Sequence, residues 1–222
     1  MLQAFPTKNG TGVSIYGDFG DLNCLYDTVH AIAGRLDEEN EWQKGQNQLL
    51  MNFAYEIRKG FSGNRLTEAF RYPGEDHTLH YYGFQAVWTD MFLFIAALRH
   101  NAGFVQTDKV HQASLYMLEH VIERALEAYD PVGASELKKY IGRGIPIYSE
   151  YVFLIYQALH IDFVSMRGGK PRFRKIPPML SNYFSEWAPE YKTLLAHLQK
   201  SADANKCRII DLTLSDFPDI RW

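Results

Sequence analysis

The densest run of positive charge in the chain lies in a segment rich in glycine and proline. No acidic residue occurs between Ser165 and Asn182, and five basic side chains fall within that stretch. Forked arginine and lysine donors suit phosphate, carboxylate or a nucleic-acid backbone. The sequence therefore predicts an anion-binding loop over residues 165–178, and the alternative is an ordinary solvated loop. The candidate anion-binding residues are Arg167, Lys170, Arg172, Arg174 and Lys175, and Lys138, Lys139 and Arg143 could extend the patch.

Two acidic residues lie in or beside the most apolar parts of the chain, Asp90 and Glu150. A buried carboxylate is costly unless it is paired or hydrogen-bonded. Two such groups that meet in a cleft could act as a general acid and a general base. One hypothesis is therefore a hydrolase-like enzyme for small molecules, using both carboxylates and a histidine in a cleft lined by tyrosines. The alternative is that each carboxylate occupies the first turn of a helix, where the helix dipole favours it.

Histidine spacing gives little support for a metal site. Metal sites in helical bundles use Glu-x-x-His on two helices and one further Glu from each of two others. The pairs in this chain use Asp instead of Glu, or fall in a predicted hairpin where residues three apart face opposite sides. A nucleophile elbow and a phosphate-binding loop are also absent from the sequence. We therefore predict no metal and no cofactor. The pairs considered are Asp27 with His30, Asp108 with His111, and His77 with His80.

Asp90 and Glu150 lie in two long apolar stretches that are predicted as helices, about 84–101 and about 146–164. Pro146 takes the first helical position of the second. A helix that is apolar on all sides must be wrapped by other elements. The apolar run of the first is too short for a membrane span, which needs roughly 20 residues. It is expected to be the central helix. Its start is open, because Thr89 could be an N-cap, and 79–88 would then be a longer strand. Because two such helices are a lot for one domain to enclose, we expect one to lie partly at a homodimer interface.

The β-structure is predicted to be small and mainly antiparallel. It combines a strand at 12–16, a hairpin of 65–72 with 77–82 around Pro73-Gly74-Glu75-Asp76, and a C-terminal strand at 207–213 that returns to the N-terminal sheet. Residues 1–222 are therefore predicted to form one α+β domain, predominantly α-helical, packed around the central apolar helix. The other predicted helices are about 21–34, 43–60, 107–129, 134–141, 178–187 and 189–202, and Asp18, Asp21 and Gly34 are placed to cap the first of them.

Composition narrows the class of partner. The apolar fraction of 46% is that of a globular protein, and the net charge of −3 gives no overall attraction to nucleic acid or to an anionic membrane. Cys24 and Cys207 have no metal or redox spacing, which is typical of reduced thiols in the cytoplasm. The N-terminal residues do not resemble a secretion signal. The expected partner is an anionic small molecule or a protein, rather than a membrane or nucleic acid.

The N-terminal segment carries a resemblance to a known family. The run Gly12-Val13-Ser14-Ile15-Tyr16-Gly17-Asp18, continued by Asp21-Leu22 and Leu25-Tyr26-Asp27, resembles the start of an uncharacterised bacterial protein family. The resemblance covers about the first 30 residues. It implies a bacterial, cytoplasmic protein and assigns no catalytic residue. The preferred interpretation is a non-catalytic binding protein, and the hydrolase-like enzyme is the alternative.

Overall fold

The protein is described by a computed structural model over residues 1–71 and 78–222, and it has the predicted α+β architecture, with helices predominating. The described elements are β1 (Gln3–Pro6), β2 (Gly12–Gly17), α1 (Phe19–Ala33), α2 (Glu41–Phe61), β3 (Leu66–Arg71), β4 (Thr78–Val87), α3 (Trp88–Ala102), α4 (Lys109–Tyr129), α5 (Pro131–Leu137), α6 (Val152–Ser165), α7 (Lys170–Phe173), α8 (Ile176–Tyr183) and α9 (Pro189–Asn205), with short 3-10 turns at Lys138–Tyr140 and Ile209–Asp211.

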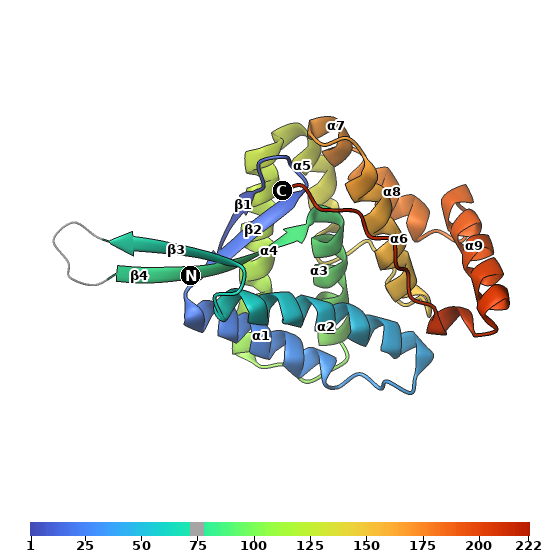
Figure 1. Cartoon of the computed structure of the whole chain (residues 1–222). Helices are drawn as coiled ribbons and strands as arrows, with labels where there is room; N and C mark the ends of the chain where they lie inside the picture. The colour runs from blue at the N-terminus through green and yellow to red at the C-terminus, as the bar shows by residue number, and fades with distance from the viewer. Residues whose placement is uncertain (72–77) are drawn as a thin grey trace.

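The sheet is antiparallel throughout its described part, with the strand order β1-β2-β4-β3. Its register places Ile15 opposite Phe84 and Leu66 opposite Gly83. The predicted hairpin is therefore confirmed, and it extends away from the helices (Figure 1). The turn expected at 73–76 lies outside the described residues. Helix α4 packs on β1, and α2 packs against β4.

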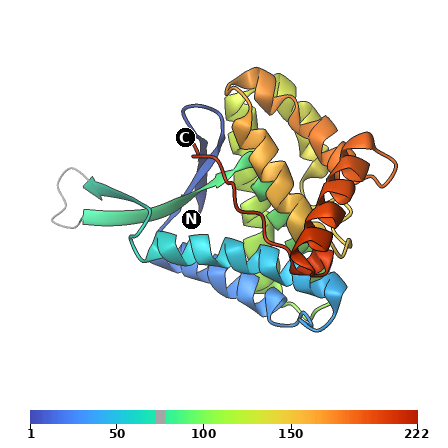
Figure 2. The ribbon, with the colours of Figure 1, turned by 45° about the vertical axis from the view of Figure 1, so that its right-hand side comes forward.

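Helix α3 is the central helix, but it begins at Trp88 rather than near residue 84. Residues 84–87 complete β4, because Val13 and Ile15 of β2 pair with Ala86 and Phe84. The alternative of a longer strand is thus correct, although Thr89 is not the N-cap. Val87 occupies that position and makes no side-chain cap. Twelve of the fifteen residues of α3 are buried, so the neighbouring helices enclose it within one chain (Figure 2).

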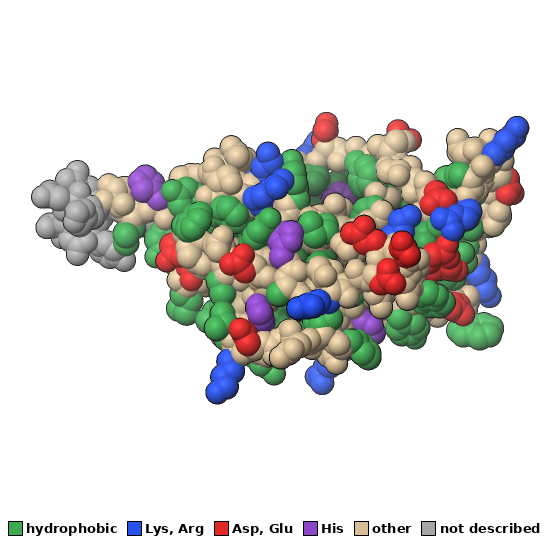
Figure 3. All heavy atoms as spheres, turned by 90° about the horizontal axis from the view of Figure 1, so that it is seen from below, with side chains coloured by type: hydrophobic (Ala, Val, Ile, Leu, Met, Phe, Trp, Pro, Cys, Tyr) green, Lys and Arg blue, Asp and Glu red, His purple; other side chains and the backbone are tan. Residues whose placement is uncertain are grey.

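Local capping follows the sequence closely. Asp18 and Asp21 form a capping box at the start of α1, and Gly34 ends that helix. Asp108 forms a second capping box with His111 at the start of α4. The acidic residues of the α1–α2 connection are largely exposed, and Figure 3 shows acidic side chains on this face of the molecule. In the described part of the chain, no helix is both long and apolar enough to cross a membrane.

The structure corrects several predicted boundaries. Helix α6 begins at Val152, because residues 141–151 bury Ile145 and Ile147 without forming an α-helix, and Gln46 Nε2 donates to the Ile147 carbonyl. Helix α5 starts at Pro131 and ends at Leu137, where the 3-10 turn takes over. Helix α8 covers 176–183 rather than 178–187, and the predicted basic loop contains α7.

The predicted C-terminal strand is wrong. Residues 209–211 form a 3-10 turn, and no residue after it belongs to the sheet. Apolar and charged residues alternate at 207–213 for a different reason. Ile209 is partly buried, and the neighbouring Arg208 forms ion pairs with Glu41 and Asp211. The segment from Leu212 onward runs along α6 and ends beside the β1–β2 connection in both views (Figures 1 and 2). We call residues 212–222 the C-terminal segment.

The C-terminal segment is held at both ends by hydrogen bonds. The backbone N–H of Leu214 donates to Gln157 Oε1 of α6 at 3.4 Å. At the other end, the Thr11 hydroxyl donates to the Arg221 carbonyl, and Asn9 Nδ2 donates to the Trp222 carbonyl at 2.7 Å. The segment therefore forms a wall between two pockets. Pro218, Asp219 and Arg221 line one of them, and Ile220 and Trp222 line the other.

Candidate functional site

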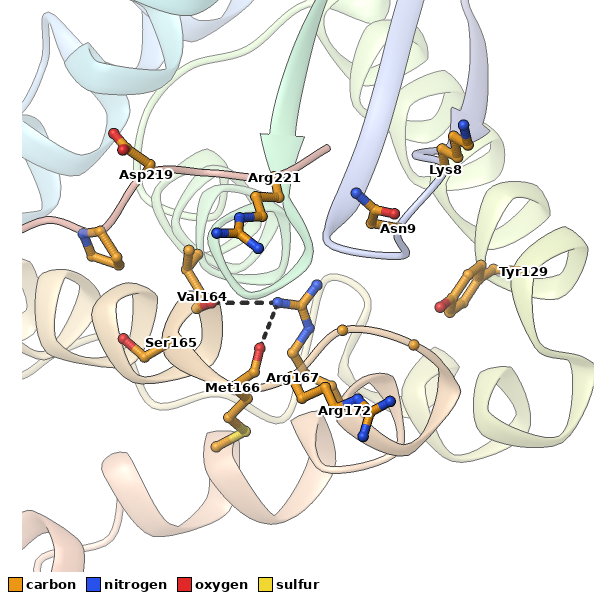
Figure 4. Close-up of a pocket in the computed structure, with 13 residues that line it drawn as sticks. Lys8, Asn9, Tyr129, Val164, Ser165, Met166, Arg167, Arg172, Asp219 and Arg221 are labelled. Carbon is orange, nitrogen blue, oxygen red and sulfur yellow. Dashed lines mark hydrogen bonds between the residues drawn. The ribbon is translucent and has the colours of Figure 1, made fainter.

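A pocket of about 950 Å³ opens where the α6–α7 connection, the β1–β2 connection, the end of α4 and the C-terminal segment meet (Figure 4). Two of the five predicted anion-binding residues, Arg167 and Arg172, line it. Lys8 and Arg221 add positive charge from opposite ends of the chain, and Asp219 is the acidic residue of the lining. We call this the Arg172 pocket. Its lining residues are Lys8, Asn9, Tyr129, Val164, Ser165, Met166, Arg167, Gly168, Gly169, Arg172, Pro218, Asp219 and Arg221.

Arg172 is the most unusual residue of this pocket, because only 5% of it is exposed. Its Nη1 donates to the carbonyls of Val164 at 3.5 Å and Met166 at 3.2 Å (Figure 4). Its Nη2 donates to Thr11 Oγ1 at 2.7 Å. The guanidinium lies over the Phe163 ring, 4.8 Å from its centroid. Its Nε is buried and has no hydrogen-bond partner among the described residues. Carbonyls, a hydroxyl and a ring thus hold the group in place without neutralising it.

The charge of Arg172 is not balanced by a carboxylate in the described part of the chain, where no acidic group lies within salt-bridge distance of it. Burial lowers the pKa of its guanidinium from the usual value, and the Tyr129 hydroxyl acts in the opposite direction. Arginine nevertheless stays protonated in proteins. A buried charge without a partner is unfavourable. An anion in the pocket would therefore relieve the electrostatic cost of burying this residue.

The other three predicted anion-binding residues lie elsewhere. Arg174 forms a two-pronged ion pair with Asp130, whose carboxylate is buried at the start of α5 (Nε–Oδ2 2.6 Å and Nη2–Oδ1 3.0 Å). Lys170 and Lys175 are exposed and do not line the pocket. The short helix α7 explains this division, because residues two apart on a helix point in different directions. Lys138 and Lys139 pair with Glu127 and Glu136, so they do not extend the site; Arg143 does not line it either.

Replacing Arg174 with glutamine is expected to lower stability at neutral pH, because Asp130 would lose its partner. The Arg174 hydrogen bonds hold the pKa of the Asp130 carboxyl below its usual value. Stability from this pair is therefore present above the unfolded pKa of about 3.9 and is lost as pH falls through the folded pKa. Urea denaturation should show a lower midpoint than wild type at pH 7 and a smaller gap near pH 3. An unchanged midpoint at pH 7 would contradict the structural role of Arg174.

Asp90 lies in a second pocket, of about 600 Å³, and is paired with a histidine there. Its Oδ2 is 2.8 Å from His160 Nδ1, and the Thr89 hydroxyl donates to its Oδ1 at 3.3 Å. Asp90 also lies in the first turn of α3, as the alternative interpretation predicted. Tyr156 and Tyr55 line the same pocket. We call it the His160 pocket; its other lining residues are Asn52, Glu56, Asn64, Arg65, Leu66, Gln85, Ala86, Val87, Phe94, Ile220 and Trp222.

Glu150 does not meet Asp90. It lines a separate groove of about 490 Å³, with Trp42, Tyr148 and Trp187. Burial, and then Glu150, raise the pKa of the Tyr151 hydroxyl to about 12. It also precedes α6 instead of lying in its first turn, because that helix begins two residues later. Both predicted roles of Glu150 are therefore wrong. The prediction fails because α6 begins at Val152, later than the residues from Pro146 onward suggest.

Metal binding finds no support in the described residues, which contain no group of three metal-ligating side chains. His111 completes the capping box with Asp108, and Asp27 accepts from Asn23. His30 packs against the Tyr26 ring at 4.3 Å between centroids. The predicted pair of His77 with His80 falls partly outside the described residues. Both cysteines are free thiols, Cys24 partly buried and Cys207 exposed.

Sequence reasoning missed the residues that complete each pocket. Lys8, Asn9, Thr11 and Arg221 carry no local motif, and they reach Arg172 only through the fold. His160 was available as one of eight histidines, and its place within an apolar helix was the one signal that could have singled it out.

Comparison with known proteins gives a family. No curated protein and no solved structure matches the chain. Residues 2–222 match the family model described as "Domain of unknown function (DUF6904)". The match extends the N-terminal resemblance over nearly the whole sequence and confirms that it leads to an uncharacterised family. The chain therefore belongs to the family with that domain of unknown function, DUF6904.

Proposed function

We propose that the protein binds a small anionic molecule in the Arg172 pocket. The observation that carries this proposal is the buried guanidinium of Arg172, which lines a pocket and has no carboxylate partner among the described residues. Three further basic side chains share the pocket with one acid, so its lining is positive although the chain as a whole carries a charge of −3. The charge of the pocket lining is therefore opposite in sign to the net charge of the chain.

The shape of the site favours a small molecule over a protein surface. Ligand pockets are typically concave spaces of about 300–1,000 Å³, and the Arg172 pocket falls within that range. Forked guanidinium donors match phosphate and carboxylate groups. Gly169, at a φ of 105°, lets the chain turn from α6 into α7 and bring Arg172 beneath the pocket. The ligand class is therefore an organic phosphate or carboxylate.

Titration with inorganic phosphate and with citrate, followed by calorimetry and by chemical shifts in NMR spectra, tests the proposal. A hydrogen bond to a charged group is worth about 1.5–3 kcal/mol. We therefore expect Arg167→Gln to weaken binding at least tenfold. Arg167 is exposed, so this variant is expected to fold. Affinity should also fall as salt rises.

Lys175→Gln is the matched control, since it removes the same charge from an exposed residue outside the pocket. It should bind like wild type, and so should Arg174→Gln once its lower stability is allowed for. An equal loss in Arg167→Gln and Lys175→Gln would refute a localised site. Absence of binding at millimolar concentrations of both anions would refute the proposal itself.

The sequence also predicts a bacterial, cytoplasmic homodimer, and we keep that as part of the proposal. Neither apolar helix needs a partner chain to cover it, because α3 and the inner face of α6 are covered within a single chain. Light scattering during size-exclusion chromatography distinguishes a monomer from a homodimer. A mass of one chain at micromolar concentration would refute the dimer.

A further inference from the structure

The His160 pocket contains a pair of groups arranged for proton transfer. Asp90 on α3 and His160 on α6 are 6% and 8% exposed, and 2.8 Å separates Oδ2 from Nδ1. A carboxylate at Nδ1 favours the tautomer with the proton on that nitrogen, and it leaves the lone pair of the neutral imidazole on Nε2. Both residues line the pocket. The pair therefore supplies an oriented base at a site that a small molecule can enter.

Tyr156 supplies a proton donor beside this base. Burial, and then the charge of Asp90, raise the pKa of the Tyr156 hydroxyl far above its usual value, so it is protonated at neutral pH. The Asn52 amide acts on that pKa in the opposite direction. Because Tyr156 lines the same pocket as Asp90 and His160, its phenolic proton is available to a ligand there. Base and acid thus lie in one pocket.

The remaining lining residues favour an uncharged ligand. Arg65 and Glu56 neutralise each other through two hydrogen bonds of 2.8 and 2.9 Å. Flat rings from Phe94 and Trp222 offer apolar surface, and the amides of Asn52, Asn64 and Gln85 offer hydrogen bonds. Among the described residues the lining holds no serine, threonine or cysteine, so we take water as the nucleophile that the pair activates. This chemistry contrasts with that of the Arg172 pocket on the other side of the C-terminal segment.

We infer that the Asp90–His160 pair activates water for hydrolysis of a small neutral carbonyl compound, an ester or a lactone. His160 Nε2 takes a proton from water while the water oxygen bonds to the carbonyl carbon, and the carbonyl electron pair moves to oxygen. The tetrahedral intermediate then collapses and the bond to the leaving oxygen breaks. Tyr156 donates its proton to that oxygen, and the proton held on His160 returns to the phenolate. No oxidant, reductant or second substrate is needed.

The groups around His160 determine how this reaction depends on pH. Burial lowers the pKa of the imidazole, but the charge and the hydrogen bond of Asp90 outweigh burial and raise the pKa overall. Tyr156 faces it from its own helix, and the paired Glu56 and Arg65 lie at the pocket's edge. The C-terminal segment contributes the edge of Phe217, at 5.7 Å between ring centroids. The rate should therefore rise with pH, through a midpoint above the usual histidine value of about 6.5.

Hydrolysis of p-nitrophenyl acetate and of a fluorogenic lactone tests this inference. General base catalysis typically contributes about 10²–10⁴-fold, so we expect His160→Gln to lose at least about a hundredfold in rate. His197→Gln, the same change at an exposed histidine outside this pocket, should match wild type. Asp90→Asn should lower the midpoint of the pH profile, which a merely structural role would not do.

Tyr156→Phe keeps the ring and removes only the hydroxyl, so it remains informative if His160→Gln does not fold. It should lose about tenfold or more in rate with no loss in phosphate binding at the Arg172 pocket. Equal rates for wild type and Tyr156→Phe would overturn the inference. So would a wild-type rate on both probes no higher than that of urea-denatured protein. A loss of rate in His197→Gln as large as that in His160→Gln would overturn it as well.

Discussion

Asp90→Ala is expected to lower the free energy of unfolding by about 3 kcal/mol at pH 6, since removing one partner of a buried pair leaves the other charge uncompensated. The effect should depend on pH in a defined direction. The folded pKa of His160 is raised above its unfolded value. Stability from its charge is therefore fully present below about pH 6.5 and is lost as pH rises through the folded pKa. The difference between wild type and variant should shrink in alkaline solution.

Urea denaturation at pH 5.5 and pH 9 measures this difference directly. Asp108→Asn provides the control, because it alters a second carboxylate–histidine contact, with His111, in which the carboxylate is well exposed to water. Solvent screening should leave little pH dependence of the pairing there. If Asp90→Ala costs the same free energy at both pH values, His160 is not charged in the folded protein, and the electrostatic account of the pair fails.

Gly12→Ala is expected to cost about 3 kcal/mol, the upper end for overpacking of a filled interior. A methyl group on Gly12 would lie 2.0 Å from the Ala86 carbonyl oxygen and 2.9 Å from the Val87 Cα. Both are backbone atoms of β4, and the β2–β4 pairing holds them in place. The neighbouring Thr11 accepts the Arg172 hydrogen bond and holds the C-terminal segment. The variant should therefore also bind phosphate more weakly.

Thermal and urea unfolding of Gly12→Ala should be compared with Ser14→Ala, which creates the same residue two positions along the same strand. Ser14 is half-buried and is hydrogen-bonded to Gln85 at 3.3 Å, so its loss should be small. Phosphate titration of both variants separates local damage at Thr11 from general loss of stability. If Gly12→Ala were as stable as Ser14→Ala, the close approach of β2 and β4 at this point would be disproved.

Local structure was largely predictable because it depends on residues near one another in the chain. Asp18 and Asp21 make their capping box within a single turn, and Gly34 ends the same helix. The hairpin pairing of β3 with β4 follows from adjacent strands around a turn signal. The predictions failed where an apolar run was taken as one element. Residues 84–87 belong to β4 because β2 offers a pairing edge. Residues 146–151 stay outside α6, although they include the apolar Ile147.

The sites depended on distances that no local pattern encodes. Asp90 is an acid within an apolar stretch, and its partner His160 lies seventy residues away on another helix. The basic cluster is visible in the sequence, but the fold directs Arg172 into a pocket and Arg174 to Asp130. Lys8 and Arg221 join the pocket from opposite ends of the chain.

The sequence by itself determined the proportion of helix, the caps, the hairpin, and which types of chemistry the chain could offer. Hydrophobic period and capping residues act over a few positions, so these features are fixed locally. Only the tertiary structure decided which charged groups share a pocket and which neutralise one another. That choice follows from how the buried faces of α3, α6 and the sheet pack together, because packing sets the separation and burial of side chains that are remote in sequence.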